Sequence, residues 1–208
     1  MRIGIIGAGH IGGTLARHFA DGGHEAAVSN SRGPETLAGL VEELGGRVRA
    51  MTAAEAARFG EVVIVSVPFG RYRELPTDVT PGAVVIDTTN YYPQRDGRFG
   101  ELDSDRTTSS QMLQAHLPDA RVVKAFNAIV WTGLRDRGRP AGDGARIGSP
   151  ISGDDEQAKR TVAQLIDEIG FDPVDAGTLA DGGRRHQPGT PAYSKGLRTE
   201  ELRARLAA

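Results

Sequence analysis

The sequence predicts an α/β protein built on a mostly parallel, doubly wound β-sheet with helices on both faces, followed by a small C-terminal extension. Short apolar runs rich in β-branched residues alternate along the chain with stretches whose apolar residues recur at helical spacing. This alternation is typical of βαβ units. The clearest strand segments, 61–66 and 83–87, are apolar without alternation, which favours strands covered on both faces.

Strands are expected wherever an apolar run lies between turn-forming residues. They are predicted, in chain order, at 2–6, 24–29, 47–50, 61–66, 83–87, 120–125, 145–151 and 171–177. The segment at 47–50 is a weak strand pattern, and the one at 145–151 follows a Gly- and Pro-rich stretch at 138–144.

Helices are expected between these strands. Apolar residues from Ile11 to Phe19 recur at helical spacing and predict a first helix that ends near Gly22. Pro34 suits the first turn of a second helix, whose apolar face runs through 37–44. Further helices are predicted at 52–58, 108–116, 154–169 and 199–206.

Two segments depart from the alternating pattern. Residues 88–110 are polar, rich in Asp, Arg, Ser and Thr, and are expected to form a loop that leads into a helix. From Gly182 onward the sequence is irregular as far as the short helix predicted at 199–206. We expect one domain at 1–180 and a tail at 181–208 that completes a pocket, reaches a neighbouring subunit or is a mobile end.

The composition excludes several classes of protein. A chain of 208 residues with a net charge of −2 can bury a core but has no basic excess for binding nucleic acid. It has no cysteine, hence no disulfide or thiolate, and its five histidines show no ligand spacing, so no metal is expected. No apolar run suits a membrane span, and MRIGIIGAGH leaves no room for a signal peptide. A cytoplasmic protein is therefore expected.

A glycine-rich loop carries the strongest functional signal. Residues 7–12, Gly-Ala-Gly-His-Ile-Gly, match GxGxxG between a predicted strand and a predicted helix. Gly7 permits the tight turn, Gly9 lets the backbone approach a pyrophosphate, and Gly12 lets the helix pack on the strand. Phosphates then bind the free N–H groups at the positive end of the helix. The loop predicts a dinucleotide-binding Rossmann domain in which His10 and Ile11 lie beside the cofactor; the alternative is a turn that only packs strand against helix.

The end of the second strand indicates which dinucleotide is bound. NAD enzymes place a carboxylate there to bond the ribose 2′-hydroxyl. This chain has Ser29, Asn30, Ser31 and Arg32, with no acidic residue before Glu35. Hydroxyls and a guanidinium bind a 2′-phosphate, which a carboxylate would repel. The segment predicts NADP(H) with Arg32 as the main contact, the alternative being a helix N-cap at Ser31 beside a solvated arginine.

Candidates for the reactive end of the site are few. Residues 66–68, Ser-Val-Pro, follow the fourth strand and are expected to line the nicotinamide, or else to form an ordinary strand exit. Lys124 either donates a proton or projects into solvent, and Tyr91–Tyr92 either contact substrate or cap apolar surface. His186 is expected to be a solvated residue, and Trp131 to be part of the core or, alternatively, a pocket wall.

Several segments together carry a resemblance to a known family. They are the glycine loop, SNSR at 29–32, SVPFG at 66–70, KAFNAI at 124–129 and ISGDDEQAK through DAGTL at 151–179. Over nearly the whole chain to about residue 180 they resemble the F420-dependent NADP oxidoreductases and the related NADPH-binding domain of the STEAP metalloreductases. In that family NADPH passes a hydride to a deazaflavin, or to a flavin in the membrane relatives. The resemblance implies that the nicotinamide and the second ring system are surrounded by Ser66, Val67, Pro68, Ala125, Phe126 and Asn127.

The leading hypothesis is therefore an NADPH-dependent oxidoreductase with a flavin-like or deazaflavin (F420) acceptor, in which Asn127 faces the nicotinamide amide or the acceptor. The chain departs from the archaeal F420 reductases in having GAGHIG instead of their GGTGxxG loop, and in its tail. Alternatives are a reductase of a small carbonyl or imine, with its pocket formed by 88–110 and the tail, and a non-catalytic NADP-binding regulator. Both enzyme hypotheses suggest a homodimer, and the acceptor and the direction of reaction stay open.

Overall fold

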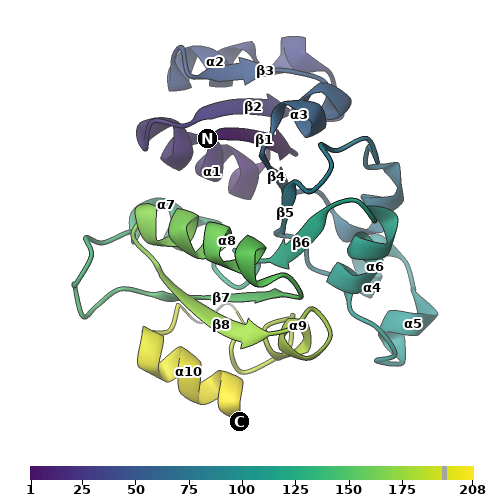
Figure 1. Ribbon diagram of the computed structural model, residues 1–208, viewed down its shortest axis with the longest axis vertical. Coiled ribbons are helices and arrows are strands. Elements are labelled where there is room, and N and C mark those ends of the chain that lie inside the picture. Colours follow the sequence, from purple (N-terminus) through teal and green to yellow (C-terminus); the bar gives the residue numbers. More distant parts are fainter. Residues whose placement is uncertain (194–195) are drawn as a thin grey trace.

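The computed structural model describes residues 1–193 and 196–208 and contains an eight-stranded sheet in the order β3-β2-β1-β4-β5-β6-β7-β8. The sheet runs from β3 at one end of the molecule to β8 near the other (Figure 1). The strands are β1 Arg2–Ile6, β2 Glu25–Ser29, β3 Val48–Ala50, β4 Val62–Val65, β5 Val84–Asp87, β6 Arg121–Lys124, β7 Gly148–Gly153 and β8 Asp172–Gly177. Each strand expected from the sequence is present, and the α/β fold class is confirmed.

The sheet is mostly parallel, as predicted. β1 to β6 pair in parallel, and their order 3-2-1-4-5-6 is that of the dinucleotide-binding doubly wound fold, with its crevice at the carboxyl ends of β1 and β4. β7 is antiparallel to β6 and parallel to β8. It meets β6 through the pairs Val123–Gly153 and Lys124–Ser152 alone, so β7 and β8 form a reversed extension of the sheet.

Helices fill the connections between strands. They are α1 His10–Asp21, α2 Ala38–Leu44, α3 Ala53–Phe59, α4 Pro93–Asp96, α5 Gly100–Asp103, α6 Ser109–His116, α7 Trp131–Asp136, α8 Glu156–Glu168, α9 Asp181–Arg185 and α10 Thr199–Ala207, with 3₁₀ helices η1 Pro34–Leu37 and η2 Phe69–Glu74. None of the helices in the described ranges is long and apolar enough to cross a membrane.

Some short helices differ from the sequence prediction. The expected loop at 88–110 contains α4 and α5, and the start of the irregular tail contains α9. These helices have four or five residues, and one turn is too short to show a hydrophobic period. Two residues of the predicted irregular segment, Ser194 and Lys195, lie outside the described residues.

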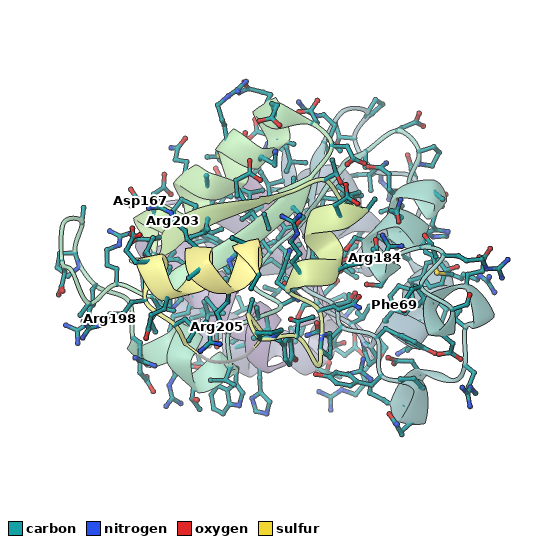
Figure 2. All side chains as sticks on the ribbon, turned by 90° about the horizontal axis from the view of Figure 1, so that it is seen from below. Phe69, Asp167, Arg184, Arg198, Arg203 and Arg205 are labelled. Carbon is teal, nitrogen blue, oxygen red and sulfur yellow. The ribbon has the colours of Figure 1, made fainter. Side chains whose placement is uncertain are left out.

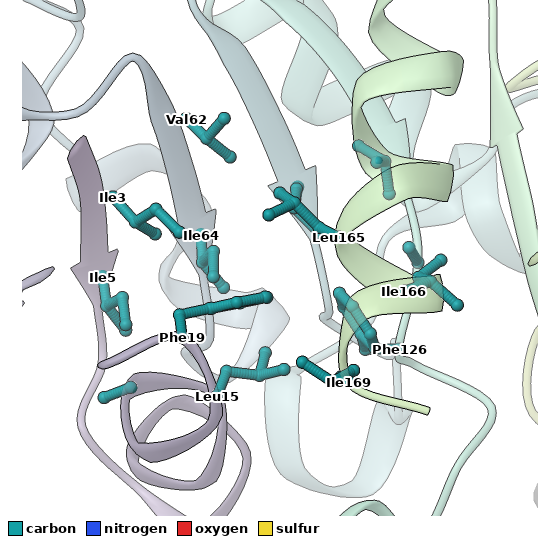
Figure 3. Close-up of a cluster of buried hydrophobic side chains, with 14 of the residues drawn as sticks. Ile3, Ile5, Leu15, Phe19, Val62, Ile64, Phe126, Leu165, Ile166 and Ile169 are labelled. Atoms are coloured by element: carbon teal, nitrogen blue, oxygen red, sulfur yellow. The ribbon is translucent and has the colours of Figure 1, made fainter. Parts of the chain in front are cut away.

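Two hydrophobic clusters cover the faces of the sheet. On one face Phe19 and Leu15 of α1 meet Leu165 of α8 and Ile169, which follows this helix, over the strands, as Figure 3 shows. The other face packs α3, η2 and α6 through residues such as Leu113 and Leu117. A fully buried Leu or Phe contributes about 1.5–3 kcal/mol, so these two layers hold the helices against the sheet.

An aromatic cluster fixes the segment at 88–110 to the rest of the domain. Phe69 of η2 stacks on Tyr72 with ring centroids 4.9 Å apart, and Tyr91 and Phe99 meet it edge-on at 5.9 and 5.4 Å. The Tyr91 hydroxyl donates to Asp103 at 2.8 Å and accepts from the N–H of Phe99. Figure 2 shows Phe69 on the side of the molecule where the helices of this segment lie. Tyr91 therefore caps apolar surface, one of its two expected roles.

A buried ion pair joins the carboxyl ends of β5 and β6. Lys124 is 2% exposed and its Nζ lies 3.5 Å from Oδ2 of the fully buried Asp87, so the expectation that it projects into solvent is wrong. Lys124 also donates to the carbonyl of Thr89 and to Oγ of Ser109, at 3.0 and 3.3 Å. Asp87 accepts from the Ser110 hydroxyl at 2.6 Å. The pair thus connects two strands to the N-terminal turn of α6.

The tail is tied to the sheet through a second buried network. His186 is fully buried, so the prediction of a solvated histidine is wrong. Its Nδ1 lies 2.9 Å from Oδ1 of Asn127, and its Nε2 lies 2.7 Å from Oγ of Ser152. Because an amide oxygen only accepts, Nδ1 carries the proton and Nε2 accepts from Ser152. Further on, Leu202 and Leu206 of α10 pack under β8.

Burial, reinforced by the positive charge of Lys124, lowers the pKa of His186 from 6.5 to about 3. In the unfolded chain the imidazole takes up a proton as the pH falls below 6.5, whereas the folded protein stays neutral until about pH 3. The stability that neutral His186 contributes is therefore present above pH 6.5 and is lost on acidification towards pH 3, by up to about 1.4 kcal/mol per pH unit.

Replacing His186 by Gln is expected to flatten this part of the pH dependence, although the variant is less stable at pH 7. The measurement is the free energy of urea unfolding between pH 7 and 5. His18→Gln is the matched control, since His18 contacts the carbonyl of Leu134 at the surface end of α1. Equal slopes for the wild type and His186→Gln would contradict the assignment.

Candidate functional site

The glycine loop lies at the carboxyl edge of the sheet, between β1 and α1. The N–H groups of Gly7 and Ala8 both donate to the carbonyl of Ser29 at 3.0 Å, which fixes the loop to the end of β2. Gly7 has a φ of 105°, a conformation that residues with a side chain rarely adopt. α1 begins at His10 with Gly9 as its N-cap, and no side chain bonds there. The positive end of the helix is thus available to an anion.

The three glycines of the motif differ in what surrounds them. A β-carbon at Gly7 would collide with the carbonyl of Ser66, and one at Gly12 would collide with the carbonyl of Gly7. At Gly9, in contrast, an added β-carbon would meet no atom within 4 Å. Gly7 and Gly12 are therefore required by the fold itself. Gly9 faces open space, which is what close approach of a pyrophosphate to the backbone needs.

A cavity of about 350 Å³ extends from this loop. Its walls are 6–9 of the loop, 29–32 at the end of β2, 66–68 at the end of β4, and Arg71 with 74–76 of η2 and its exit. The structure thus brings together the glycine loop, the SNSR segment and the Ser-Val-Pro segment. The size and shape of the groove, with phosphate-binding features at one end, fit the adenosine and pyrophosphate half of a dinucleotide.

Within the SNSR segment, two side chains are already engaged. The Ser29 hydroxyl is fully buried and donates to the carbonyl of Ile5 at 3.1 Å. Asn30 accepts from the N–H of Arg32 at 2.9 Å and donates to Thr36 at 2.8 Å. Ser31 and Arg32 are exposed and line the cavity. Ser29 and Asn30 therefore shape the segment, and Ser31 and Arg32 are its side chains available to a phosphate.

Arg71 is a second cation on the cavity wall, and sequence reasoning missed it. Its Nε and Nη2 donate to the same oxygen of Glu74 at 2.9 and 2.6 Å, and Glu74 lines the cavity too. This hydrogen-bonded pairing raises the pKa of Arg71 and lowers the pKa of Glu74. Arg71 thus neutralises the carboxylate of Glu74 beside the phosphate end. No pattern signals this pair, because it lies on a 3₁₀ helix of six residues.

His10 and Trp131 form an exposed platform beside the loop. Their rings stack with centroids 4.4 Å apart, and the guanidinium of Arg135 lies 4.9 Å from the Trp131 ring centroid. Trp131 is partly exposed and lines a groove, so it is a pocket wall, the second of its two expected places, and not part of the core. A groove lined by Ala8, Gly9 and these side chains runs along α1. Ile11 packs, partly buried, against the main core.

Ala125, Phe126 and Asn127 follow β6 and are all buried. Phe126 adopts a φ of 60°, which turns the chain sharply after the strand. The amide nitrogen of Asn127 donates to the carbonyl of His186 and to Oδ1 of Asn90, at 2.8 and 3.1 Å, and its oxygen accepts from His186. Its hydrogen-bonding groups are therefore used within the protein. These bonds give Asn127 a role in positioning the tail, and its expected place facing the nicotinamide amide or the acceptor stays a prediction.

Comparison with known proteins is consistent with this geometry. Residues 2–91 match the family described as NADP oxidoreductase coenzyme F420-dependent. This range contains the glycine loop and every wall of the cavity.

Among curated proteins, the chain is similar to the metalloreductase STEAP3 of Rattus norvegicus, with 31% identity over 185 residues. The alignment covers 86% of this chain but 34% of STEAP3, so the chain spans about a third of the length of that relative.

Two solved structures extend the likeness over nearly the whole chain. A hypothetical protein of Sinorhizobium meliloti superimposes with a TM-score of 0.82 at 33% identity, covering 96% of this chain and 95% of its own. A protein named as a candidate F420-dependent NADP reductase, from Arthrobacter sp. FB24, gives a TM-score of 0.73 at 27% identity and covers 88% of both chains. The resemblance seen in the sequence is confirmed: the chain belongs to the coenzyme F420-dependent NADP oxidoreductase family.

Proposed function

We propose that the protein transfers a hydride between NADP(H) and a flavin-like or deazaflavin acceptor, with F420 as the first candidate. The observation that carries the proposal is the cavity that runs from the glycine loop, past Arg32, to Ser66–Pro68 at the end of β4. Backbone N–H groups that can bind phosphate lie at one end of the cavity, and the residues that follow β4 lie at the other. NADPH, when bound, supplies the hydride from its nicotinamide ring.

The charge of the cavity supports NADP(H) over NAD(H). Arg32 lies where NAD enzymes carry a carboxylate, and Ser31 adds a hydroxyl. The carboxylate of the cavity wall, Glu74, is paired with Arg71 at 2.6 Å. A 2′-phosphate between the wall of Ser31 and Arg32 and the wall of Arg71 and Glu74 therefore meets two guanidinium groups. Neither of these walls carries an unpaired carboxylate.

The burial and hydrogen bonding of the polar side chains near the carboxyl edge of the sheet support a ring-shaped acceptor. Lys124, His186 and Asn127 are buried and hydrogen bonded to protein groups, so none of them is free to protonate a developing alkoxide. Hydride transfer between two stacked heterocycles requires proximity and orientation more than proton transfer. A small carbonyl or imine is the second candidate, because the separate cavity between the segment at 88–110 and the tail has room for a molecule of that size as well as for one end of a ring system.

The proposal is tested by following NADPH absorbance at 340 nm with purified protein and F420, FMN, FAD or a panel of carbonyls and imines. We expect rapid loss of NADPH with F420 or a flavin, and much slower loss when NADH replaces NADPH. Turnover with a carbonyl or imine alone would select the second candidate. Tight NADPH binding without turnover by any acceptor would indicate a non-catalytic regulator and overturn the proposal.

Gly9→Ala is expected to weaken NADPH binding, whereas Gly12→Ala is expected to destabilise the fold. The added methyl group at Gly9 meets no protein atom, so the melting temperature should change little while the NADPH dissociation constant rises at least about tenfold. The methyl group at Gly12 collides with the backbone of Gly7 and should destabilise the fold by about 1–3 kcal/mol. Thermal unfolding and fluorescence titration with NADPH separate the two effects. Unchanged NADPH affinity in folded Gly9→Ala would place the pyrophosphate elsewhere.

Arg32→Ala is expected to raise the KM for NADPH about 10- to 100-fold, because a charge-assisted bond to the 2′-phosphate is worth about 1.5–3 kcal/mol. The KM for NADH, which lacks this phosphate, should change little. Arg49→Ala serves as the control, since Arg49 is exposed on β3 and pairs with Glu25 outside the cavity. An equal rise in the KM for NADPH and in the KM for NADH in Arg32→Ala would show that Arg32 acts through the structure of the loop instead.

A further inference from the structure

A second cavity, of about 340 Å³, lies beside the carboxyl ends of β5 and β6 and shares no lining residue with the cofactor cavity. One wall is formed by Tyr91–Pro93 and Leu102, another by Thr107 and Ser109 at the start of α6, and a third by 187–189 of the tail. In open α/β sheets the carboxyl ends of the strands are where ligands bind. The cavity therefore lies at the same carboxyl edge of the sheet as the cofactor cavity.

Ser109 is a directed hydrogen-bond donor at this cavity. It is 8% exposed, and Nζ of Lys124 donates to its oxygen at 3.3 Å. Because an ammonium group only donates, the Ser109 oxygen accepts this bond and its own hydroxyl hydrogen stays available. That hydrogen reaches no other described residue within hydrogen-bond distance. A buried cation behind the hydroxyl strengthens it as a donor.

The position of Ser109 is fixed by the ion pair described above. The remaining donors of Lys124 point to the carbonyl of Thr89 at 3.0 Å and to Asp87 at 3.5 Å. Ser110, the next residue, donates to Asp87 at 2.6 Å. The first turn of α6 is thus held against the ends of two strands, and the hydroxyl of Ser109 is pre-oriented.

The opposite wall adds a second polar group. Gln187 lines the cavity, and its side-chain amide makes no hydrogen bond to another described residue. It follows His186, whose buried bonds to Asn127 and Ser152 fix this part of the tail. The remaining walls are the rings of Tyr91 and Tyr92 with Pro93, Leu102 and Pro188. Apolar and aromatic walls with a few fixed polar groups are typical of a site for a flat organic molecule.

We propose that this cavity binds the oxygen-bearing end of a flat acceptor, whose carbonyl or carboxylate oxygen accepts a hydrogen bond from Ser109. That the ligand is the hydride acceptor rests on the proposed function. That the ligand is a flat molecule with an acceptor oxygen rests on the cavity and the Lys124–Ser109 contact alone. Ser109 is then a specificity-determining residue for the acceptor.

The test is a titration of ¹⁵N-labelled full-length protein with benzoate, a flat ring bearing a carboxylate, followed by amide chemical shifts. Benzylamine is the matched ligand, with the same ring and no acceptor oxygen. Saturable shifts with benzoate at residues around the cavity, and none with benzylamine, are expected. Ser109→Ala should weaken benzoate binding at least about tenfold. Ser109→Thr, which keeps the hydroxyl, should bind within about threefold of the wild type.

Two further variants keep the result interpretable. Ser104→Ala removes an exposed hydroxyl of the same segment, which bonds the carbonyl of Gly100, and should leave benzoate binding unchanged. Gln187→Ala changes the opposite wall without touching the ion pair, and should weaken binding several-fold even if Ser109→Ala folds poorly. Wild-type benzoate affinity in folded Ser109→Ala, or the absence of saturable binding to the wild type, overturns the inference; if Ser109→Ala does not fold, wild-type affinity in Gln187→Ala overturns it.

Failure of the proposed function has a different signature. In that case NADPH is not oxidised with any ring acceptor, while benzoate binding still depends on Ser109.

Discussion

The carboxyl edge of the sheet depends on the buried ion pair between Lys124 and Asp87. Neither side chain is accessible to water, so each charge is stabilised only by its partner and by the hydrogen bonds around it. Leaving one of two such charges unpaired typically costs about 3–5 kcal/mol. The bonds to Thr89, Ser109 and Ser110 carry this constraint into the segment after β5 and into α6. The pair therefore sets the geometry of the wall that Ser109 contributes to the second cavity.

Local signals in the sequence were sufficient for the sheet and for the cofactor side. Buried strands such as β4 and β5 show as unbroken apolar runs, and α1 and α8 are long enough for a helical period. The glycine loop is equally local, because Gly7 and Gly12 are constrained by atoms of neighbouring turns and strands. The order of the parallel strands then brings SNSR and Ser-Val-Pro to one cavity, as the Rossmann topology requires.

The polar interior could not be predicted in this way, because its contacts join residues far apart in the chain. His186 meets Ser152 and Asn127 across 34 and 59 positions, so nothing in its own neighbourhood indicates that it is buried. Lys124 was ambiguous for the same reason, as its partners lie 15 and 35 positions away. The role of Arg71 depends on its pairing with Glu74 within a 3₁₀ helix of six residues, which is too short to show a sequence pattern. The expected homodimer stays a prediction, since the structure describes one chain.

The separation of the two cavities has a consequence for how such a protein diversifies. Every residue of the cofactor cavity lies between positions 6 and 76, inside the range shared with the family. The second cavity is built from positions 91 to 109 and 187 to 189, almost entirely beyond that range. Under the proposed function, mutations in the later segments alter which molecule receives the hydride and leave the cofactor cavity unchanged. One cofactor module can in this way be inherited unchanged by descendants that act on different acceptors.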